Sequence, residues 1–172
     1  MYNLCVCCGE IIPEGRMVCP KCEKGEISLE VPYRKLKVTL DPGAHLPTRA
    51  HPNDAGLDLY AMERKYIPGN SYAALDTGVH VQIPEGFVGM ITSKSGLMAN
   101  HGITCRGTID SGYTGSIRAV LFNHSGTDYI VEKGQKITQL VLVPIITPVP
   151  VVVDSLEETE RGSCGFGSTG KF

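Results

Sequence analysis

The sequence contains no tryptophan, and aromatic residues make up only 6% of its 172 residues. Its 16 basic and 18 acidic residues almost cancel, and a formal net charge of -2 argues against a protein that coats nucleic acid by bulk charge. The longest apolar run, 140–153, is interrupted by three prolines, so it is not expected to cross a membrane as a helix. No export signal is visible at the start, and we therefore expect a cytoplasmic protein without membrane contact.

Glycine and proline are abundant, with 20 and 11 residues, which favours many tight turns over long helices. Apolar residues make up 42% of the chain, enough to bury a core and to exclude disorder by composition. The composition changes along the chain and predicts three parts. These are a cysteine-rich module at 1–28, a β-rich domain at 33–153, and a C-terminal arm at 154–172 that is acidic first and then glycine-rich.

The middle part alternates short runs of strand-forming residues with turn residues such as Asp41-Pro42-Gly43. No stretch has a sustained helical period, although a short helix can follow Ser95 at 96–100. Short strands at this spacing predict an all-β fold of the sandwich, jelly-roll or barrel type. The predicted strands are 33–40, 79–83, 87–92, 116–122, 129–131, 136–143 and 149–153.

Five of the seven cysteines lie within the first 22 residues. Cys5, Cys8, Cys19 and Cys22 follow the spacing C-x2-C-x10-C-x2-C. Four thiolates complete the tetrahedral shell that Zn2+ prefers and leave no open position, so the spacing predicts a structural zinc site in a zinc-ribbon-like module. Metal binding would supply the folding free energy that so small a piece lacks. Cys7 could replace Cys5 or Cys8, and unligated or disulfide-linked cysteines are the alternative interpretation.

Five short segments hold most of the candidate chemistry. Taken one at a time, each has an ordinary explanation as a turn or a cap. The last contains Gly165-x-Gly167-x-x-Gly170, but it lacks the preceding strand and following helix that a dinucleotide-binding or P-loop motif requires. Its glycines predict instead a flexible clamp that can approach a ligand closely. The segments are 55–61, 92–103, 106–123, 134–140 and 161–170.

Together and in this order, the five segments resemble the motifs of the trimeric deoxyuridine triphosphatases (dUTPases), over about residues 33–172. The resemblance implies a β jelly roll that forms a homotrimer. It implies active sites shared among all three subunits, with the C-terminal arm of one subunit closing a site built by the other two. The implied reaction is hydrolysis of dUTP to dUMP and pyrophosphate, with Mg2+ held on the substrate triphosphate.

The resemblance also implies roles for residues in the third segment. Asp110 matches the general base that activates a water for attack on the α-phosphorus. Tyr113 matches the tyrosine that packs under the deoxyribose and excludes a 2'-hydroxyl. The backbone of the hairpin 107–119, beginning with Gly107, Thr108 and Ile109, would read the edge of the uracil.

The other segments are implied to hold the phosphates and close the site. Lys94, Ser95 and Gly96 match the phosphate-binding turn. Gln139 matches a ligand of a phosphate or a water, and Asp58 matches an aspartate that supports the site and the hydrated metal. In the arm, Arg161 would hold the γ-phosphate and Phe166 would cover the uracil. The other arm residues expected to bind substrate are Gly167, Ser168 and Thr169.

One departure and two alternatives accompany this resemblance. Lys94 stands where the family commonly has arginine, and it lacks the bidentate fork of that side chain. The run 116–122 has no glutamate, which argues against a dCTP deaminase of the same fold. A regulator that senses dUTP, with the zinc module bound to DNA or a protein partner, is the remaining alternative. The apolar run 140–153 is expected in the core or in a subunit contact.

Overall fold

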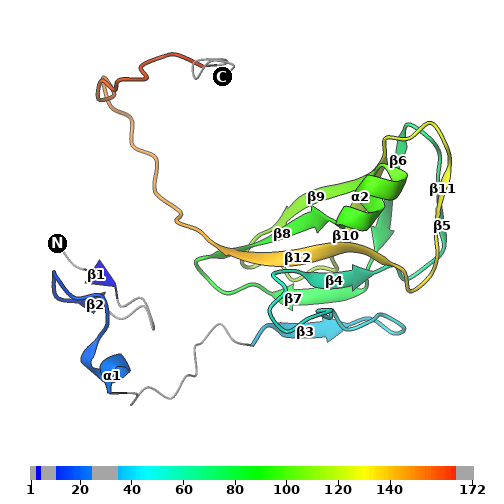
Figure 1. The fold of residues 1–172 in the computed structure, drawn as a ribbon, viewed down its shortest axis with the longest axis horizontal. Helices are drawn as coiled ribbons and strands as arrows, with labels where there is room; N and C mark the ends of the chain where they lie inside the picture. Colours follow the sequence, from blue (N-terminus) through cyan, green and yellow to red (C-terminus); the bar gives the residue numbers. More distant parts are fainter. Residues whose placement is uncertain (1–2, 5–10, 25–34, 166–172) are drawn as a thin grey trace.

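The structure is a computed structural model that describes residues 3–4, 11–24 and 35–165. It contains twelve strands and two short helices within those ranges, which confirms the predicted all-β class (Figure 1). The first elements are β1 (Asn3–Leu4), β2 (Ile11–Ile12) and α1 (Pro20–Glu23). The others are β3 (Lys37–Leu40), β4 (Leu57–Tyr60), β5 (Lys65–Ile67), β6 (Ser71–Asp76), β7 (Val79–Gln82), β8 (Phe87–Ser93), α2 (Ser95–His101), β9 (Ile103–Ile109), β10 (Arg118–Asn123), β11 (Tyr129–Val131) and β12 (Lys136–Pro144).

The β-domain is built around one antiparallel six-stranded sheet with the order β4-β12-β8-β9-β10-β6. Two further antiparallel pairs, β3–β7 and β5–β11, complete it. In Figure 1 the β3–β7 pair lies below the sheet and the β5–β11 pair extends from one end. The strands that are neighbours in the sheet are mostly distant in sequence, so the pairing brings the separated segments together.

Burial alternates along the strands, because successive side chains point to opposite faces of a sheet. On β10, Ala119, Leu121 and Asn123 are buried, whereas Arg118 and Phe122 are exposed. The inward side chains of all these strands form one continuous apolar core. Its buried members are Leu59, Ala61, Ile67, Leu75, Val79, Val81, Ile83, Ile91, Ile103, Cys105, Ile117, Ala119, Leu121, Val131, Ile137 and Leu140.

Most predicted strands are confirmed, with boundaries that move by a few residues. Strands β3, β7, β8, β10, β11 and β12 overlap the predicted runs, and α2 contains the predicted helix at 96–100. The first two residues of the predicted run 33–40 lie outside the described residues. Within the β-domain, four strands were not predicted, namely β4, β5, β6 and β9. They are short, or they carry glycine, alanine and charged residues that weaken the strand pattern.

The prediction of a strand at 149–153 is wrong. Of the residues described, 145–165 form no strand and extend away from the sheet (Figure 1, orange to red). The β-branched residues favour a strand, but Pro148 and Pro150 lack the N–H of a ladder, and no strand in the described part of the chain pairs with them. Val149, Val151 and Val152 are 83%, 77% and 99% exposed. Within the predicted apolar run, Leu140 is buried in the core and 145–153 is not.

The N-terminal module is described only in part. Cys5 and Cys8 of the predicted zinc set lie outside the described residues, as does the side chain of Cys22. Cys19 is buried together with Ile12 at the beginning of α1. In the described part of the chain, no group of three or more His, Cys, Asp or Glu side chains is arranged to hold a metal. No helix in that part is long and apolar enough to cross a membrane.

Candidate active site

The strand register places residues of four predicted segments in one row. Asp58 on β4 pairs with Gln139 on β12, which pairs with Thr92 on β8, and Thr92 pairs with Arg106 on β9. Directly paired residues point to the same face of a sheet. The row therefore brings the first four segments together, although Asp58 and Gln139 are far apart in sequence.

Asp58 is a buried carboxylate, 5% exposed, held between two lysines. Oδ1 accepts a hydrogen bond from Nζ of Lys94, and Oδ2 lies 2.7 Å from Nζ of Lys136. Burial by itself would raise the pKa of Asp58. The hydrogen bonds from Lys136 and Lys94 and the charges of both outweigh burial, so this pKa lies below its ordinary value of 3.8.

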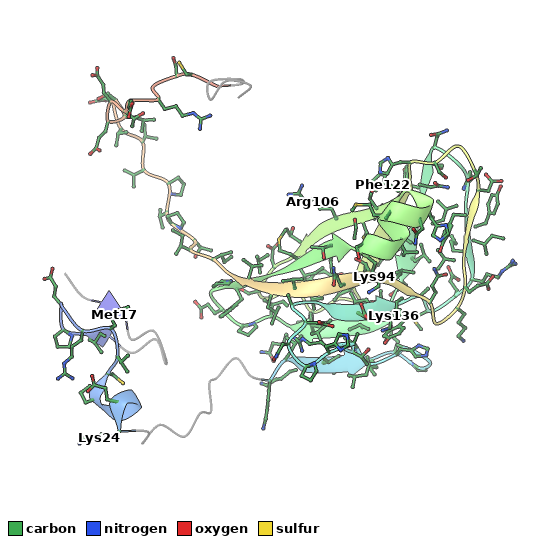
Figure 2. The ribbon with its side chains drawn as sticks, viewed as in Figure 1. Met17, Lys24, Lys94, Arg106, Phe122 and Lys136 are labelled. Atoms are coloured by element: carbon green, nitrogen blue, oxygen red, sulfur yellow. The ribbon has the colours of Figure 1, made fainter. Side chains whose placement is uncertain are left out.

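Lys136 was not among the predicted site residues. The hydrogen bond to Asp58 and its charge raise the pKa of Lys136 above its ordinary value. Figure 2 draws the side chains of Lys94 and Lys136 near one another, whereas Arg106 projects from β9 into solvent. Lys136 lies inside the predicted segment 134–140, but a lone lysine there reads as a solvated charge. Only the pairing of β4 with β12 reveals its partner.

Gln139 is held in place by a bond and by a close approach. Its Nε2 donates to the backbone oxygen of Ser93 over 3.2 Å. Its Oε1 lies so close to Gly56 that a Cβ there would stand 2.2 Å from it. Glycine at position 56 is therefore required by the position of the Gln139 side chain, and the first and fourth predicted segments are in contact.

The predicted phosphate turn lies where β8 passes into α2. Lys94 is the N-cap residue, with an extended backbone, and its carbonyl oxygen accepts from the N–H of Met98 over 3.0 Å. Ser95 and Gly96 are exposed. A Cβ on Gly96 would meet no atom within 4 Å, so the space above this turn is open. The Lys94 side chain turns back from here to Asp58.

Asp110 and Tyr113 lie in the loop between β9 and β10. Asp110 directly follows β9 and is exposed, and its carbonyl oxygen accepts from the N–H of Tyr113 over 3.1 Å. Gly112 makes this turn with a φ of +93°. The Tyr113 hydroxyl donates to the carbonyl of Ser116 over 3.0 Å, and its ring lies against Gly115, where a Cβ would stand 2.6 Å from Cζ.

The predicted uracil-reading residues lie just before this loop. Gly107, Thr108 and Ile109 pair with β8 on one edge. The pairing of β9 with β10 begins at Ile103 and ends at Cys105 in the described structure. The other edge of 107–109 therefore has no strand partner among the described residues.

The predicted site residues of one chain form two separate groups. One group contains Asp58, Lys94 and Gln139, and the other contains Asp110 and Tyr113. Ile109 pairs with Gly89, near the beginning of β8, whereas Lys94 follows its end. At about 3.3 Å per residue, the groups are roughly 20 Å apart along the strand.

The C-terminal arm brings none of its described residues to either group. Arg161 is exposed, and its Nε donates to the carbonyl oxygen of Cys164 within the arm over 3.1 Å. Phe166, Gly167, Ser168 and Thr169 lie outside the described residues. In chemical terms, the first group is a cationic surface with amide and hydroxyl donors that suits anionic oxygens. The second offers a carboxylate, an aromatic ring and a free backbone edge.

Comparisons with known proteins agree with these features. The family model described as dUTPase matches residues 43–170. A deoxyuridine 5'-triphosphate nucleotidohydrolase of Clostridium tetani is 44% identical over 140 residues, covering 80% of this chain and 96% of that protein. The corresponding protein of Yarrowia lipolytica is 45% identical over 139 residues, covering 78% of this chain and 88% of that protein.

Solved structures agree as well. The dUTPase of Staphylococcus bacteriophage 80alpha, determined with dUPNHPP, is 34% identical with a TM-score of 0.75, and the match covers 80% of this chain and 99% of that one. A variant dUTPase from phage phi11 of S. aureus, whose structure reveals a coordinated structural Mg(II) ion, is 30% identical with a TM-score of 0.67, covering 72% and 99%. The chain belongs to the dUTPase family.

Proposed function

We propose that this protein hydrolyses dUTP to dUMP and pyrophosphate. The observation that carries the proposal is the family match over 43–170, a range that contains both groups of site residues. The curated relatives at 44% and 45% identity are deoxyuridine 5'-triphosphate nucleotidohydrolases and are matched over most of their length. The exposed carboxylate of Asp110 and the cationic surface around Lys94 agree with phosphoryl chemistry.

In this proposal, Asp110 is the general base. Its carboxylate accepts a proton from a water as the water oxygen attacks the α-phosphorus and the bond to the bridging oxygen of pyrophosphate breaks. A single positioned base of this kind contributes about 10²–10⁴-fold to the rate. The remaining requirement is neutralisation of the phosphate charge, to which Lys94, Lys136 and Arg161 contribute.

A divalent metal would be held mainly on the substrate triphosphate. The carboxylate of the first group, Asp58, already pairs with two lysines, so this group does not supply an all-protein metal cage. Mg2+ typically keeps several waters and binds through substrate phosphates and one or two carboxylates, which fits this donor set. Asp58 would accept hydrogen bonds from the hydrated metal, and the ion would withdraw negative charge from the phosphate oxygens.

Recognition of the base and sugar falls to the second group. The free backbone edge of 107–109 offers donors and acceptors in a fixed pattern, which can select uracil over cytosine. The Tyr113 ring, supported by Gly115 and by its bond to Ser116, offers a flat wall for the deoxyribose. Ser95, Gly96 and Gln139 would bind phosphate oxygens or a water, and Phe166 to Thr169 would close over the substrate.

The active form in this proposal is a homotrimer. In this proposal Asp110 acts at the α-phosphorus and the Lys94 group binds phosphate oxygens of the same nucleotide. The two groups of one chain lie much farther apart than neighbouring phosphates do, so one substrate would be bound by groups from different copies. The exposed apolar side chains after β12, among them Ile146, Val152 and Leu156, also favour contact with another subunit. In the proposed division of the chain, 33–153 forms the trimer body and 154–172 the closing arm.

The N-terminal module, 1–28, is proposed to hold a structural Zn2+ through Cys5, Cys8, Cys19 and Cys22. The spacing supports it: Cys19 directly precedes α1 and Cys22 lies within it, so this C-x2-C pair falls on one short turn. A reducing, cytoplasmic setting belongs to the proposal because thiolates must stay reduced to bind zinc. Metal analysis of the purified protein, compared with a Cys19→Ser/Cys22→Ser variant, tests it: equal zinc content in both would contradict the site.

The first experiment is pyrophosphate release from dUTP, dCTP and dTTP with Mg2+. We expect turnover of dUTP alone, and a loss of at least about 10²-fold in Asp110→Asn. Saturable dUTP binding without turnover in the intact protein would contradict the enzyme. That result would favour the alternative of a dUTP-sensing protein, with the partner of 1–28 as the next question.

A further inference from the structure

His80 on β7 joins the loop that carries Asp110 and Tyr113 to another part of the domain. Its Nδ1 lies 2.9 Å from the backbone oxygen of Thr114, inside this loop. Its Nε2 lies 3.2 Å from Oδ1 of Asp41, which follows β3. The His80 side chain is partly buried, 27% exposed, so both contacts are sheltered from water only in part.

Both ring nitrogens of His80 face oxygen acceptors. A neutral imidazole has one N–H, and its other nitrogen is an acceptor that would confront one of these oxygens. Only the imidazolium donates to Thr114 and Asp41 at the same time. The hydrogen bond to Thr114 is the largest effect and raises the pKa of His80. Burial lowers it, and the contact with Asp41 raises it, so the pKa lies above its ordinary value of 6.5.

The charged groups around His80 agree with a cationic ring. Asp41 faces it from the end of β3, and Asp76 acts on it from the end of β6. Lys37 on β3 lines the same surface hollow of about 460 Å³ as His80 and Thr114, and it is the opposing positive charge there. Arg118 on β10 acts on Asp76, so the two carboxylates stand against two positive charges, and the direct contact with Asp41 favours the protonated ring.

The acceptors on both sides are themselves fixed. The N–H of Asp41 donates to the carbonyl oxygen of Gly78 over 2.8 Å, which holds the turn after β3 against β7. On the other side of the loop, the Ser116 hydroxyl donates to Asp76, which also accepts from the N–H of Gly78 over 2.9 Å. His80 and Asp76 thus hold the loop at two neighbouring points, Thr114 and Ser116.

We infer that His80 is a positioning residue for the active-site loop 110–116: as an imidazolium it bridges Asp41 to Thr114 and keeps Asp110 and Tyr113 in the orientation that binds dUTP. The effect of the bridge on dUTP binding rests on the proposed function. Its geometric part, the bridge itself, does not depend on that function. His80 does not contact the reacting atoms, so its effect passes through the loop backbone.

The bridge predicts a dependence on pH with a definite sign. A group whose pKa is raised by folding contributes its stabilisation fully below the unfolded value and loses it as the pH rises through the folded value. The loop should therefore be best ordered below about pH 6.5 and should loosen above the folded pKa. We expect the KM for dUTP to rise across that interval by about three- to tenfold, the range of one hydrogen bond, with kcat less affected.

The test compares the intact protein with His80→Asn and Asp41→Asn. The asparagine amide can still donate toward Thr114 but does not titrate, so the step in KM should disappear. Asp41→Asn keeps the histidine and removes its charged partner, so the step should move to lower pH. NMR titration of the His80 ring between about pH 5 and 8 follows the charge directly, and the amide signals of Tyr113 and Ser116 should shift with it.

Three results separate the inference from the proposed function. A His80 that titrates at or below 6.5, or loop amides that ignore its titration, would overturn the bridge. KM profiles that coincide in the intact protein and His80→Asn would overturn its role in positioning. If the intact protein did not release pyrophosphate from dUTP, the proposed function would be contradicted. The NMR titration would still test whether His80 bridges Asp41 and Thr114.

Discussion

Nζ of Lys136 lies 2.7 Å from Oδ2 of Asp58, while the other oxygen of the same carboxylate accepts from Lys94. Two ammonium groups and one carboxylate leave one positive charge in excess next to the predicted phosphate turn. If Asp58 paired with Lys94 alone, the charge of that lysine would be neutralised. Because Lys136 shares the carboxylate, the surface remains cationic, and both lysines are held in place without rotating freely.

Removing the carboxylate should therefore cost more than removing either lysine. In Asp58→Asn, two ammonium groups face each other without a counter-charge. We expect the free energy of unfolding at neutral pH to fall by about 2 kcal/mol and activity to fall with it. Urea unfolding measures the first effect. Because the pKa of Asp58 is lowered in the fold, its contribution is present above the unfolded value of 3.8 and is lost as the pH falls through the lower folded value. A stability difference that is unchanged in strong acid would contradict this account.

Lys136→Gln should raise the KM for dUTP by about tenfold, because Lys94 alone then neutralises Asp58. One lost charge-assisted hydrogen bond corresponds to roughly tenfold or more in binding. Lys133→Gln is the matched control, since Lys133 is an exposed lysine in the turn before β12. Steady-state kinetics at low and high salt would distinguish a local effect from general screening. Equal changes in the two variants would contradict a specific role for Lys136.

Gly56→Ala should displace the Gln139 side chain, because the new Cβ would stand 2.2 Å from its Oε1. We expect kcat/KM to fall by about tenfold or more, since small misplacements of site groups reduce catalysis strongly. Gly126→Ala is the control, because a Cβ there meets no atom within 4 Å. If the Gly56→Ala variant had unchanged kinetics, displacement of Gln139 would not affect catalysis. That result would contradict a role for Gln139 in the active site.

Gly115→Ala should push the Tyr113 ring from its place, where a new Cβ would stand 2.4 Å from the hydroxyl. We expect the ratio of kcat/KM for dUTP over UTP to fall, because the wall under the sugar moves. Tyr113→Phe keeps the ring and removes only the bond to Ser116, so it should retain most of this ratio. Hydrolysis of dUTP and UTP in competition measures this ratio of kcat/KM. Unaltered discrimination in Gly115→Ala would contradict the role of the ring.

Asn123→Ala should destabilise the fold without touching either group of site residues. The buried Nδ2 of Asn123 donates to the carbonyl oxygens of Ile67, Pro68 and Thr127 at 3.2, 3.2 and 2.8 Å. Leaving these acceptors unpaired should lower the free energy of unfolding by about 2–3 kcal/mol. Denaturant unfolding gives the value, and activity per folded molecule should not change. A stable variant with low activity would instead place Asn123 in the site.

Shared active sites predict complementation between two inactive variants. Lys94→Gln and Asp110→Asn each damage every site of their own homotrimer. In mixed trimers, some sites combine an intact Lys94 group with an intact Asp110 group, and co-refolding should restore about a quarter of the normal activity. Sedimentation of the mixture checks that trimers form. Failure to regain activity in proven mixed trimers would contradict the shared site.

The sequence by itself determined the fold class and the family resemblance, because both depend on local features. Short β-branched runs separated by Gly and Pro turns define an all-β chain wherever the strands later pair. The five segments 55–61, 92–103, 106–123, 134–140 and 161–170 can be recognised by residue type and order alone. From them Asp58, Lys94 and Gln139 were predicted as members of one site, and the structure brings these three together.

Only the tertiary structure decided which residues share a contact. Lys136 and His80 were missed because a lone charged or titratable residue on a strand gives no signal until register supplies its partner, Asp58 in one case and Thr114 with Asp41 in the other. The strand predicted at 149–153 failed for the same reason, since β-propensity needs a neighbouring strand to pair with. Pairing between distant strands is a property of the whole chain, and local sequence records only one side of each pair.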